Sequence, residues 1–494
     1  MLRRRVRKAG VTLYASMIAG VMLALIAACL TSARMSAARA QIVNSAEAGL
    51  FSLFGYYDRE LFDRFDIFGL NCGGNSSAAD LSSVCRTAAR YMEGVLDQNS
   101  QHLDLQNIGL TGYTLLTDRG GEPFYRQAVH SVKEGSGGAE IMAGLLLFQS
   151  RKELCRTLEE RAAREEAADW FSRYHAAMDE AERLSREAAE QEEDLLSSGD
   201  EDVLDGGGVY SPIENPVPVV ESIYDMGTDV CLAGILQSVP EAGTGTARLT
   251  GRTLLQGMEM PGGTAADDSE DSRLWFQAYV QQKTGSFRNP ASAAPSYQME
   301  FILEGTEDDR ENLERVVKRI IRLRTGKALE TIDGTPGLSA EAAELAGRIC
   351  SVYSVPPDQA VIEGTVRFCW AYAESICETL SLLSGGTVPV SENPEFIVPL
   401  GSLSSLYEYL ESAGEAVQDN GDQMGYEDFL TVFMLDLPKD VILIRTMDCV
   451  ESLLRHSGRE GFYLDHCMTE CEISADIRAN GRKTFTVTKA FGYD

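Results

Sequence analysis

The sequence predicts a mainly α-helical fold with a minor β element (α+β), in which an N-terminal transmembrane helix continues as a stalk. Residues 11–30 form an uncharged apolar run after a basic start. Long proline-free stretches repeat apolar residues every three or four positions, the spacing of one helical face. Near the C-terminus, alternating stretches at 470–477 and 483–488 flank Asn480-Gly481, a strong signal for a β-hairpin.

The first 30 residues read as a basic tail, 1–10, followed by a membrane span, 11–30. At about 1.5 Å per residue, a helix over the apolar run reaches the roughly 30 Å needed to cross the hydrocarbon core. Only a helix can do this as a single segment, because lipid offers no hydrogen bonds to a bare backbone. The cluster before the span is stronger than Arg34 and Arg39 after it. We therefore expect the N-terminus in the cytoplasm and the body outside the cell membrane. The residues that set this topology are Arg3, Arg4, Arg5, Arg7 and Lys8.

The helical pattern continues past the predicted span as a stalk over residues 31–69. This stretch contains no proline, and its apolar residues recur at helical spacing. A stripe of this kind faces a protein core or a partner. Its members are Ala46, Leu50, Leu53, Phe54, Tyr57 and Leu61.

Small residues recur every four positions through the span. Small side chains let helix backbones approach closely in lipid, where dispersion drives association. The competing interpretation is that alanine and glycine are common in any spanning helix, and a four-residue row drifts about 40° per step. We predict that the row packs against other membrane helices. Its residues are Ser16, Gly20, Ala24 and Ala28.

Two other processing routes compete with a retained membrane anchor. A cleaved secretory signal has an apolar core of about 7–15 residues, and this one is longer. Residues Ile26-Ala27-Ala28-Cys29 have the form of a lipobox, whose cysteine would be acylated. A lipoprotein then continues as a polar tether, whereas Leu30–Gln41 reads as helix. A retained anchor is favoured, and a lipoprotein acylated at Cys29 is the alternative.

The remaining chain divides into three predicted regions. Residues 70–198 are helical and include a long charged arm, 139–196, where Glu and Arg pair at i,i+3 and i,i+4 spacing. Its irregular heptads favour an arm packed within the chain over a dimeric coiled coil. Residues 199–214 form an acidic, glycine-rich linker. Residues 215–494 form a mainly helical extracytoplasmic domain that ends in the hairpin.

Two shorter segments of that domain are predicted from local signals. A helix over Val217–Met226 begins directly after Asn215-Pro216. Tyr297–Leu303 is predicted to be a strand.

The formal net charge of -31 excludes most polyanionic partners. Such a body repels phosphate backbones and anionic headgroups, and we expect no nucleic-acid binding. Ten of the 11 cysteines lie outside the predicted span. That number is too sparse for a disulfide scaffold in a chain of this length, and we expect most to be buried free thiols.

The search for catalytic motifs finds none. HExxH, GxSxG and GxxxxGK[ST] are missing, and Gly326-Lys327 lacks both the leading glycine and the following hydroxyl. Asp465-His466-Cys467 with Cys471 does not have zinc-site spacing. We predict no metal, no cofactor and no enzymatic activity. A catalytic site assembled from distant residues, such as a carboxylate pair, stays open.

Several stretches resemble a bacterial membrane-protein family of unknown function that occurs mainly in Gram-positive bacteria, near genes for tight-adherence (Tad) pili. The likeness begins with the entry stretch 11–70 and extends to Asn215-Pro216, YQMEFILEGTEDDRENLERVVKRIIRLR, YEDFLTVFMLDLP and FYLDHCMTECEISADI. The start is also similar in plan to TadE/TadG-like pseudopilins, which have basic residues, one span and then a helix rich in small residues.

The resemblance implies an exported, non-catalytic component of a pilus or secretion assembly, with other assembly proteins and the bilayer as partners. It carries no catalytic residues over to this chain. Type IV prepilins with a similar start have glutamate five residues after the glycine that precedes cleavage. Here Gly10 is followed at that position by Ala15. The departure favours an assembly component over a main fibre subunit.

Overall fold

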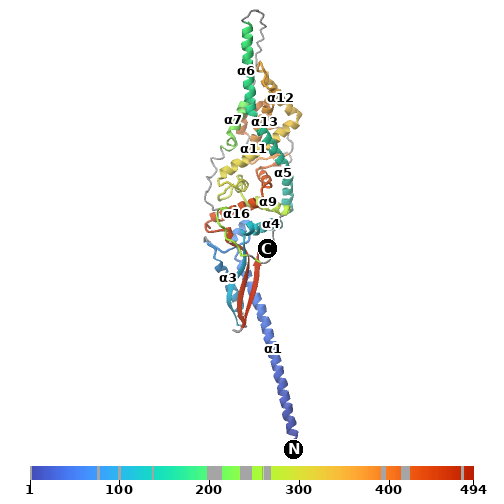
Figure 1. Ribbon diagram of the computed structural model, residues 1–494, viewed down its shortest axis with the longest axis vertical. Coiled ribbons are helices and arrows are strands. Elements are labelled where there is room, and N and C mark those ends of the chain that lie inside the picture. The colour runs from blue at the N-terminus through green and yellow to red at the C-terminus, as the bar shows by residue number, and fades with distance from the viewer. Residues whose placement is uncertain are drawn as a thin grey trace. The chain divides into compact units, whose positions relative to one another are not determined.

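The computed structural model confirms a mainly α-helical fold with a minor β element (Figure 1). The chain forms two compact units. Unit 1 comprises Met1–Ser131, Leu249–Asp268 and Leu454–Asp494, and unit 2 comprises Val132–Arg248 and Ser269–Leu453. The structure describes residues 3–74, 78–97, 102–135, 138–167, 169–196, 214–233, 248–258, 260, 269–390, 396–412, 423–479 and 483–493.

Unit 1 is built around an antiparallel sheet whose central strand comes from the end of the chain. Strand β5 pairs with β1, β2 and β6, so the predicted C-terminal hairpin is confirmed. The elements are α1 (Arg3–Phe54), α2 (Arg59–Phe65), β1 (Leu70–Asn71), α3 (Leu81–Leu96), β2 (Leu103–Leu115), most of α4 (Asp118–Glu134), η1 (Leu249–Gly251), η3 (Leu464–His466), β5 (Cys467–Ala479) and β6 (Lys483–Gly492).

The second half of α1 packs on this sheet and on α3. Its inward face is the predicted stripe, and Ala46, Leu50 and Leu53 are almost completely buried. Close approach to α3 requires a glycine, because a Cβ at Gly49 would lie 2.6 Å from Met92 Cγ. Burying this stripe anchors the stalk through the hydrophobic effect.

Strand β6 runs alongside α1 in the same direction (Figure 1). The guanidinium of Arg39 lies 5.5 Å from the centroid of the Phe485 ring. Further along, the rings of Phe51 and Phe491 are 6.0 Å apart. From Arg39 to Phe51 the helix rises by about 18 Å, and from Phe485 to Phe491 the strand advances by about 20 Å. The two elements therefore remain side by side over this length.

Unit 2 is a helical body in which α11 and α13 are the central pair. Residues Asp309–Gly334 and Gln359–Leu383 form these two helices. The other elements are α5 (Gly138–Ala167), α6 (Trp170–Leu196), α7 (Val217–Met226), α8 (Asp229–Leu232), α9 (Glu270–Lys283), α10 (Gln298–Glu304), α12 (Pro336–Cys350), β3 (Val388–Pro389), η2 (Leu400–Ser405), α14 (Leu406–Ser412), β4 (Gln423–Met424), α15 (Tyr426–Met434) and most of α16 (Lys439–His456).

The stalk differs from the prediction in where its helix ends. Helix α1 ends at Phe54 instead of continuing toward residue 69, and α2 starts at Arg59. Asp58 caps the new helix by accepting a hydrogen bond from the backbone N–H of Leu61 at 3.1 Å. Its own N–H donates to the Gly69 carbonyl at 2.8 Å. An N-cap aspartate with these bonds begins a separate helix.

The domain boundaries of the second half also differ from the sequence-based ones. The predicted linker 199–214 lies, except for its last residue, outside the described residues. The hairpin belongs to unit 1, with α1, and not to the helical body that precedes it in sequence. The predicted arm 139–196 consists of two helices, α5 and α6, and Asp169 between them has a left-handed φ of 49°.

The predicted strand Tyr297–Leu303 is wrong, because the segment is helix α10. Its alternating polar residues, Gln298 and Glu300, are buried instead of facing solvent. Gln298 accepts a hydrogen bond from the Gly285 N–H at 3.0 Å, and Glu300 accepts one from the Phe287 N–H at 2.8 Å. The two polar side chains are therefore buried because they accept hydrogen bonds from the backbone of the loop at 285–287.

Candidate functional site

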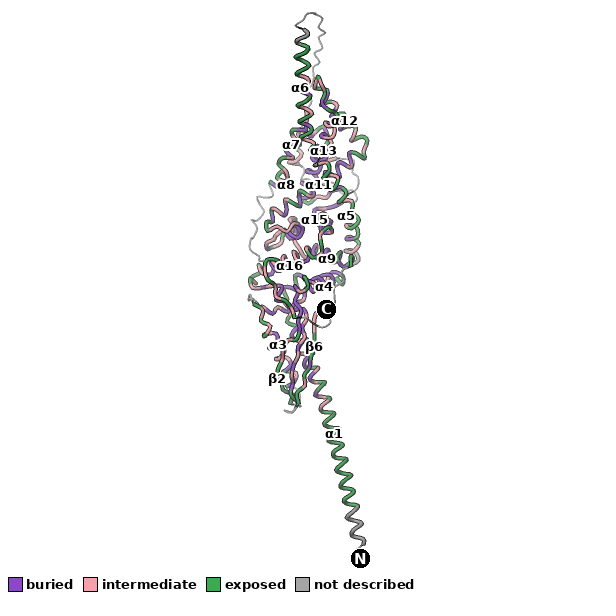
Figure 2. Tube along the Cα trace, viewed as in Figure 1, coloured by how far each residue is buried: buried purple, intermediate pink, exposed green. Residues whose placement is uncertain are grey.

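The most distinctive surface is the exposed first half of α1. Figure 2 shows this half of the helix as exposed, in contrast to the half that packs on the sheet. Val11, Val21 and Leu23 have exposed fractions of 70%, 68% and 68%. Within Val11–Phe54, an 18-residue segment has a mean hydropathy of 2.3, and none of its residues is buried. It is long and apolar enough to cross a membrane.

The polar side chains within this surface satisfy their own hydrogen bonds. The hydroxyl of Ser16 donates to the Leu13 carbonyl at 2.8 Å, and that of Thr31 donates to the Ala27 carbonyl at 2.7 Å. Bonding back to the preceding turn is the way in which serine and threonine enter a helix without an unpaired hydroxyl. Nothing polar in these two side chains therefore opposes contact with lipid.

The predicted packing row lies wholly on the exposed half of α1. Ser16, Gly20, Ala24 and Ala28 are all exposed, and a Cβ built on Gly20 meets no atom within 4 Å. The space beside the row is open to another helix, and packing along it stays a prediction. Helix α1 begins at Arg3, but the side chains of Arg3, Arg4, Arg5, Arg7 and Lys8 lie outside the described residues.

An aromatic cluster joins the end of α1 to the sheet of unit 1. The ring of Phe54 lies 4.9 Å from that of Tyr493, and the Tyr493 hydroxyl donates to the Phe54 carbonyl at 2.6 Å. Phe68 stacks on both Tyr493 and Phe62, with centroids 5.2 and 4.4 Å away. Aromatic pairs in these geometries add stability beyond their buried area. The rod is therefore fixed to its folded body at the end away from the apolar half.

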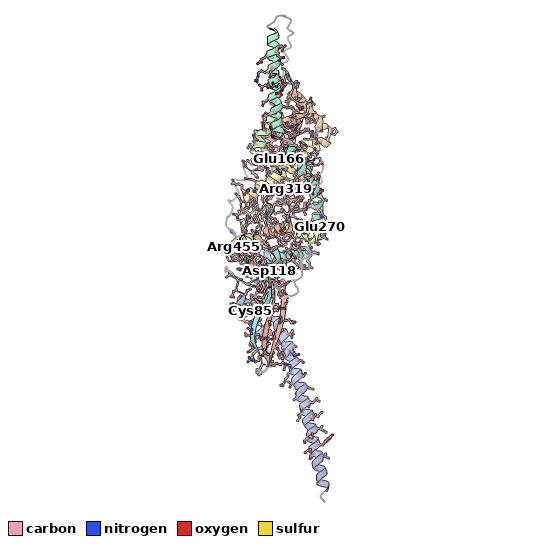
Figure 3. The ribbon with its side chains drawn as sticks, viewed as in Figure 1. Cys85, Asp118, Glu166, Glu270, Arg319 and Arg455 are labelled. Atoms are coloured by element: carbon pink, nitrogen blue, oxygen red, sulfur yellow. The ribbon has the colours of Figure 1, made fainter. Side chains whose placement is uncertain are left out.

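Unit 2 contains a cavity of about 380 Å³ between α5, α7, α8, α11 and α13. Tyr224, Phe368 and Tyr372 form its aromatic wall. Glu166, labelled in Figure 3, is paired at its rim with Arg322 at 3.0 Å. Burial raises the pKa of Tyr224 and Tyr372, so both phenols stay protonated. The lining also includes the charged residues Asp229 and Lys318.

Two aspartates of unit 1 have structural roles. Asp465 accepts hydrogen bonds from Arg252 at 2.7 Å and from the Leu255 N–H at 2.9 Å. Asp118, labelled in Figure 3, accepts from the N–H groups of Leu115 and Gly257 at 2.7 and 2.9 Å. Within the described part of the chain, no group of three or more metal-ligating side chains comes together.

The cysteines are free, and nine of them are buried. Burial raises the pKa of Cys72 and of Cys471 to about 12, which keeps both as thiols at neutral pH. The expectation of buried free thiols is therefore confirmed.

Sequence reasoning missed a set of buried carboxylates in unit 2. The Arg324 guanidinium donates to both oxygens of Glu378, at 2.6 and 2.5 Å, and to the Pro389 carbonyl at 3.0 Å. Glu374, one turn earlier on α13, accepts from the N–H groups of Ile397 and Val398 at 2.8 and 2.9 Å. Two glutamates at i,i+4 in the mostly apolar second half of α13 were the available signal, because like charges at this spacing repel unless a cation is near.

Burial of two carboxylates, those of Glu300 and Glu374, makes the stability of unit 2 depend on pH. Desolvation raises the pKa of Glu300 to about 7 and, with repulsion from Glu378, that of Glu374 to about 8. A carboxyl whose pKa is higher in the folded than in the unfolded chain favours folding while it is protonated. That stabilisation is complete below pH 4.5, the ordinary value, and is lost as the pH rises through 7 and 8.

We expect the free energy of unfolding of unit 2 to fall by an amount on the order of 3 kcal/mol between about pH 5 and pH 8. Urea titrations followed by tryptophan fluorescence measure it, because Trp170, Trp275 and Trp370 all lie in unit 2. Glu300→Gln keeps an acceptor for the Phe287 N–H but cannot ionise, so its slope against pH should be shallower. A stability that rises over this range would contradict the assignment.

The fold and the exposed surface define a mainly helical protein that presents one apolar helix long enough to cross a bilayer. The chain belongs to a family of unknown function, DUF5702, whose profile matches residues 211–479, more than half of the sequence. Comparisons with curated proteins and with solved structures found no match. The expectation of a family of unknown function is confirmed. Four of the stretches on which it rested lie inside the matched segment: Asn215-Pro216, Tyr297–Arg324, Tyr426–Pro438 and Phe462–Ile477.

Proposed function

We propose that this chain is a non-catalytic, single-pass membrane protein that serves as a structural or assembly component of a Tad-type pilus or secretion system. One observation carries the proposal. Helix α1 is continuous from Arg3 to Phe54, with an exposed apolar first half and a second half buried in unit 1. A rod of this kind couples a folded body rigidly to the bilayer, because no flexible segment separates them.

The proposed topology places the N-terminus in the cytoplasm and the folded body outside. The charge pattern supports it, since five cations precede the span and two follow it closely. The resemblance of the entry stretch to TadE/TadG-like pseudopilins supports a role beside other such helices. In that arrangement α1 packs laterally through its small residues, and assembly proteins of the pilus are the partners.

Mass analysis of the mature N-terminus tests the anchor against its alternative. An intact Met1 supports the retained span, and a diacylated Cys29 would replace the proposal by a lipoprotein with a binding or hydrolytic role. The helix runs without a break through Cys29, which supports the anchor. Protease added outside intact cells should reach the body, and access only from the cytoplasmic side would overturn the topology.

Replacing Gly20 with leucine is expected to reduce the recovery of membrane partners in pull-downs from native membranes. The side chain would fill the open space beside the row and hold a neighbouring backbone away. Tryptophan fluorescence should stay unchanged, because unit 2 contains all three tryptophans. Val21→Leu is the matched control, since Val21 is also exposed but lies outside the row. Equal partner recovery for the Gly20 variant and the parent would contradict the packing row.

A further inference from the structure

We propose that unit 1 binds the anionic headgroups of phospholipids through a basic collar at its membrane-proximal end. The inference rests on the proposed anchoring of α1 in the bilayer. The basic collar is defined as Arg34 and Arg39 on α1, Arg478 at the end of β5 and Lys483 at the start of β6. All four residues are exposed.

Tertiary structure brings these cations together from distant parts of the chain. The Arg39 guanidinium lies 5.5 Å and the Lys483 ammonium 5.2 Å from the centroid of one ring, that of Phe485. In the register of the hairpin, Ala479 is opposite Lys483 and Arg478 is opposite Thr484, so Arg478 lies at the same end of the hairpin but on the other face of the sheet. The start of β6 therefore lies beside the stalk residue Arg39, at the end of the sheet toward the exposed half of α1 (Figure 1).

The collar is not neutralised by the acidic body. Among the described residues, none of its four members forms an ion pair. Asp104 on β2 is opposite Arg478 in the strand register, but the two side chains do not form an ion pair. Residues 1–46 contain no aspartate or glutamate, although the chain as a whole carries a net charge of -31. Exposed cations that form no ion pair are open to an external anion, and the phosphates of a bilayer are anions available at this position.

The distance from the predicted span fits that partner. Arg34 is four helical residues beyond Leu30, about 6 Å, which places it within a headgroup layer some 5–7 Å thick. Arg39 is nine residues beyond Leu30, about 14 Å, so it and the hairpin cations lie within about one Debye length of the outer headgroups. Basic residues just outside a span are attracted to anionic lipid over this range.

The geometry favours a surface of many phosphates over a single phosphate ion. The four cations come from one helix and two strands, and all are open to solvent. A spread, open group of charges binds a charged plane, because each cation then meets its own phosphate.

Hydrogen exchange of the full chain in lipid nanodiscs tests the collar. We expect amides in 34–40 and 483–486 to exchange about threefold more slowly in discs with roughly 30% phosphatidylglycerol than in pure phosphatidylcholine discs. About 0.5 M NaCl should remove the difference by screening. The triple variant R39Q/R478Q/K483Q should lose the difference, and R156Q/R183Q/R186Q, which removes three exposed cations of unit 2, should keep it.

Equal exchange in the two lipids would overturn the collar. So would slow exchange in pure phosphatidylcholine discs on addition of inorganic phosphate, because it would assign the site to a free ion. Alkaline carbonate extraction separates this result from failure of the anchor. A chain that stays in the membrane but is insensitive to lipid charge refutes only the collar, whereas a chain released by carbonate refutes the proposed membrane anchor.

Discussion

Replacing Gly326 with alanine is expected to destabilise unit 2 by about 3 kcal/mol and to lower its unfolding midpoint by about 5–10 °C. Gly326 lies in α11 where that helix crosses α5. A Cβ at this position would overlap the carbonyl oxygen of Leu158 and lie 2.9 Å from its carbonyl carbon. The obstacle is backbone, so no rotamer change relieves it, and the two helices have to separate.

The same helix supplies a matched control for this substitution. Gly334 lies at the end of α11, and a Cβ there meets no atom within 4 Å. Gly334→Ala should be neutral or slightly stabilising, by up to about 1 kcal/mol, because alanine restricts the unfolded chain. Thermal unfolding followed by tryptophan fluorescence measures both variants. Similar midpoints for the two would refute close packing of α5 against α11 at Gly326.

Replacing Arg324 with methionine is expected to destabilise unit 2 by about 3–5 kcal/mol. The side chains of Arg324 and Glu378 are only 4% and 7% exposed. Removing the guanidinium leaves Glu378 buried without its cation, one turn from Glu374. The Pro389 carbonyl also loses its donor. An unpaired buried charge is far more costly than the net stability contributed by the pair.

A second substitution separates loss of the ion pair from loss of packing. In the double variant R324M/E378M, both charges are replaced by apolar side chains of similar length. We expect it to recover at least half of the lost free energy of unfolding, since well-packed apolar residues often substitute for a buried ion pair. Urea is the suitable denaturant, because guanidinium salts screen charges. A double variant as unstable as R324M would show that the packing of α11 against α13, and not the unpaired carboxylate, causes the loss.

The helices of unit 2 illustrate what local signals predict well. Helix α7, Val217–Met226, has the bounds expected from the proline that precedes it. The exposed apolar helix was likewise predictable, because 20 residues without a charge have few alternatives to a span. These features depend only on the composition and spacing of residues that are close together in the sequence.

Other features were invisible because they depend on contacts between distant segments. Glu300 lies in a segment predicted to be a strand, but it is buried in a helix and accepts a hydrogen bond from a loop amide. Gly326, examined as part of an incomplete phosphate-binding motif, is a packing glycine instead. No local pattern distinguishes a polar residue facing solvent from one that faces a buried amide.

The sequence by itself determined that this protein carries one apolar helix with a basic start, a mainly helical body and a C-terminal hairpin. The tertiary structure alone decided that the hairpin packs on the stalk of that helix, which places Lys483 next to Arg39. The physical reason is range. Charge runs and apolar periodicity act between neighbours in sequence, whereas the pairing of residue 39 with residue 485 depends on the shapes of two surfaces that exist only once each has folded.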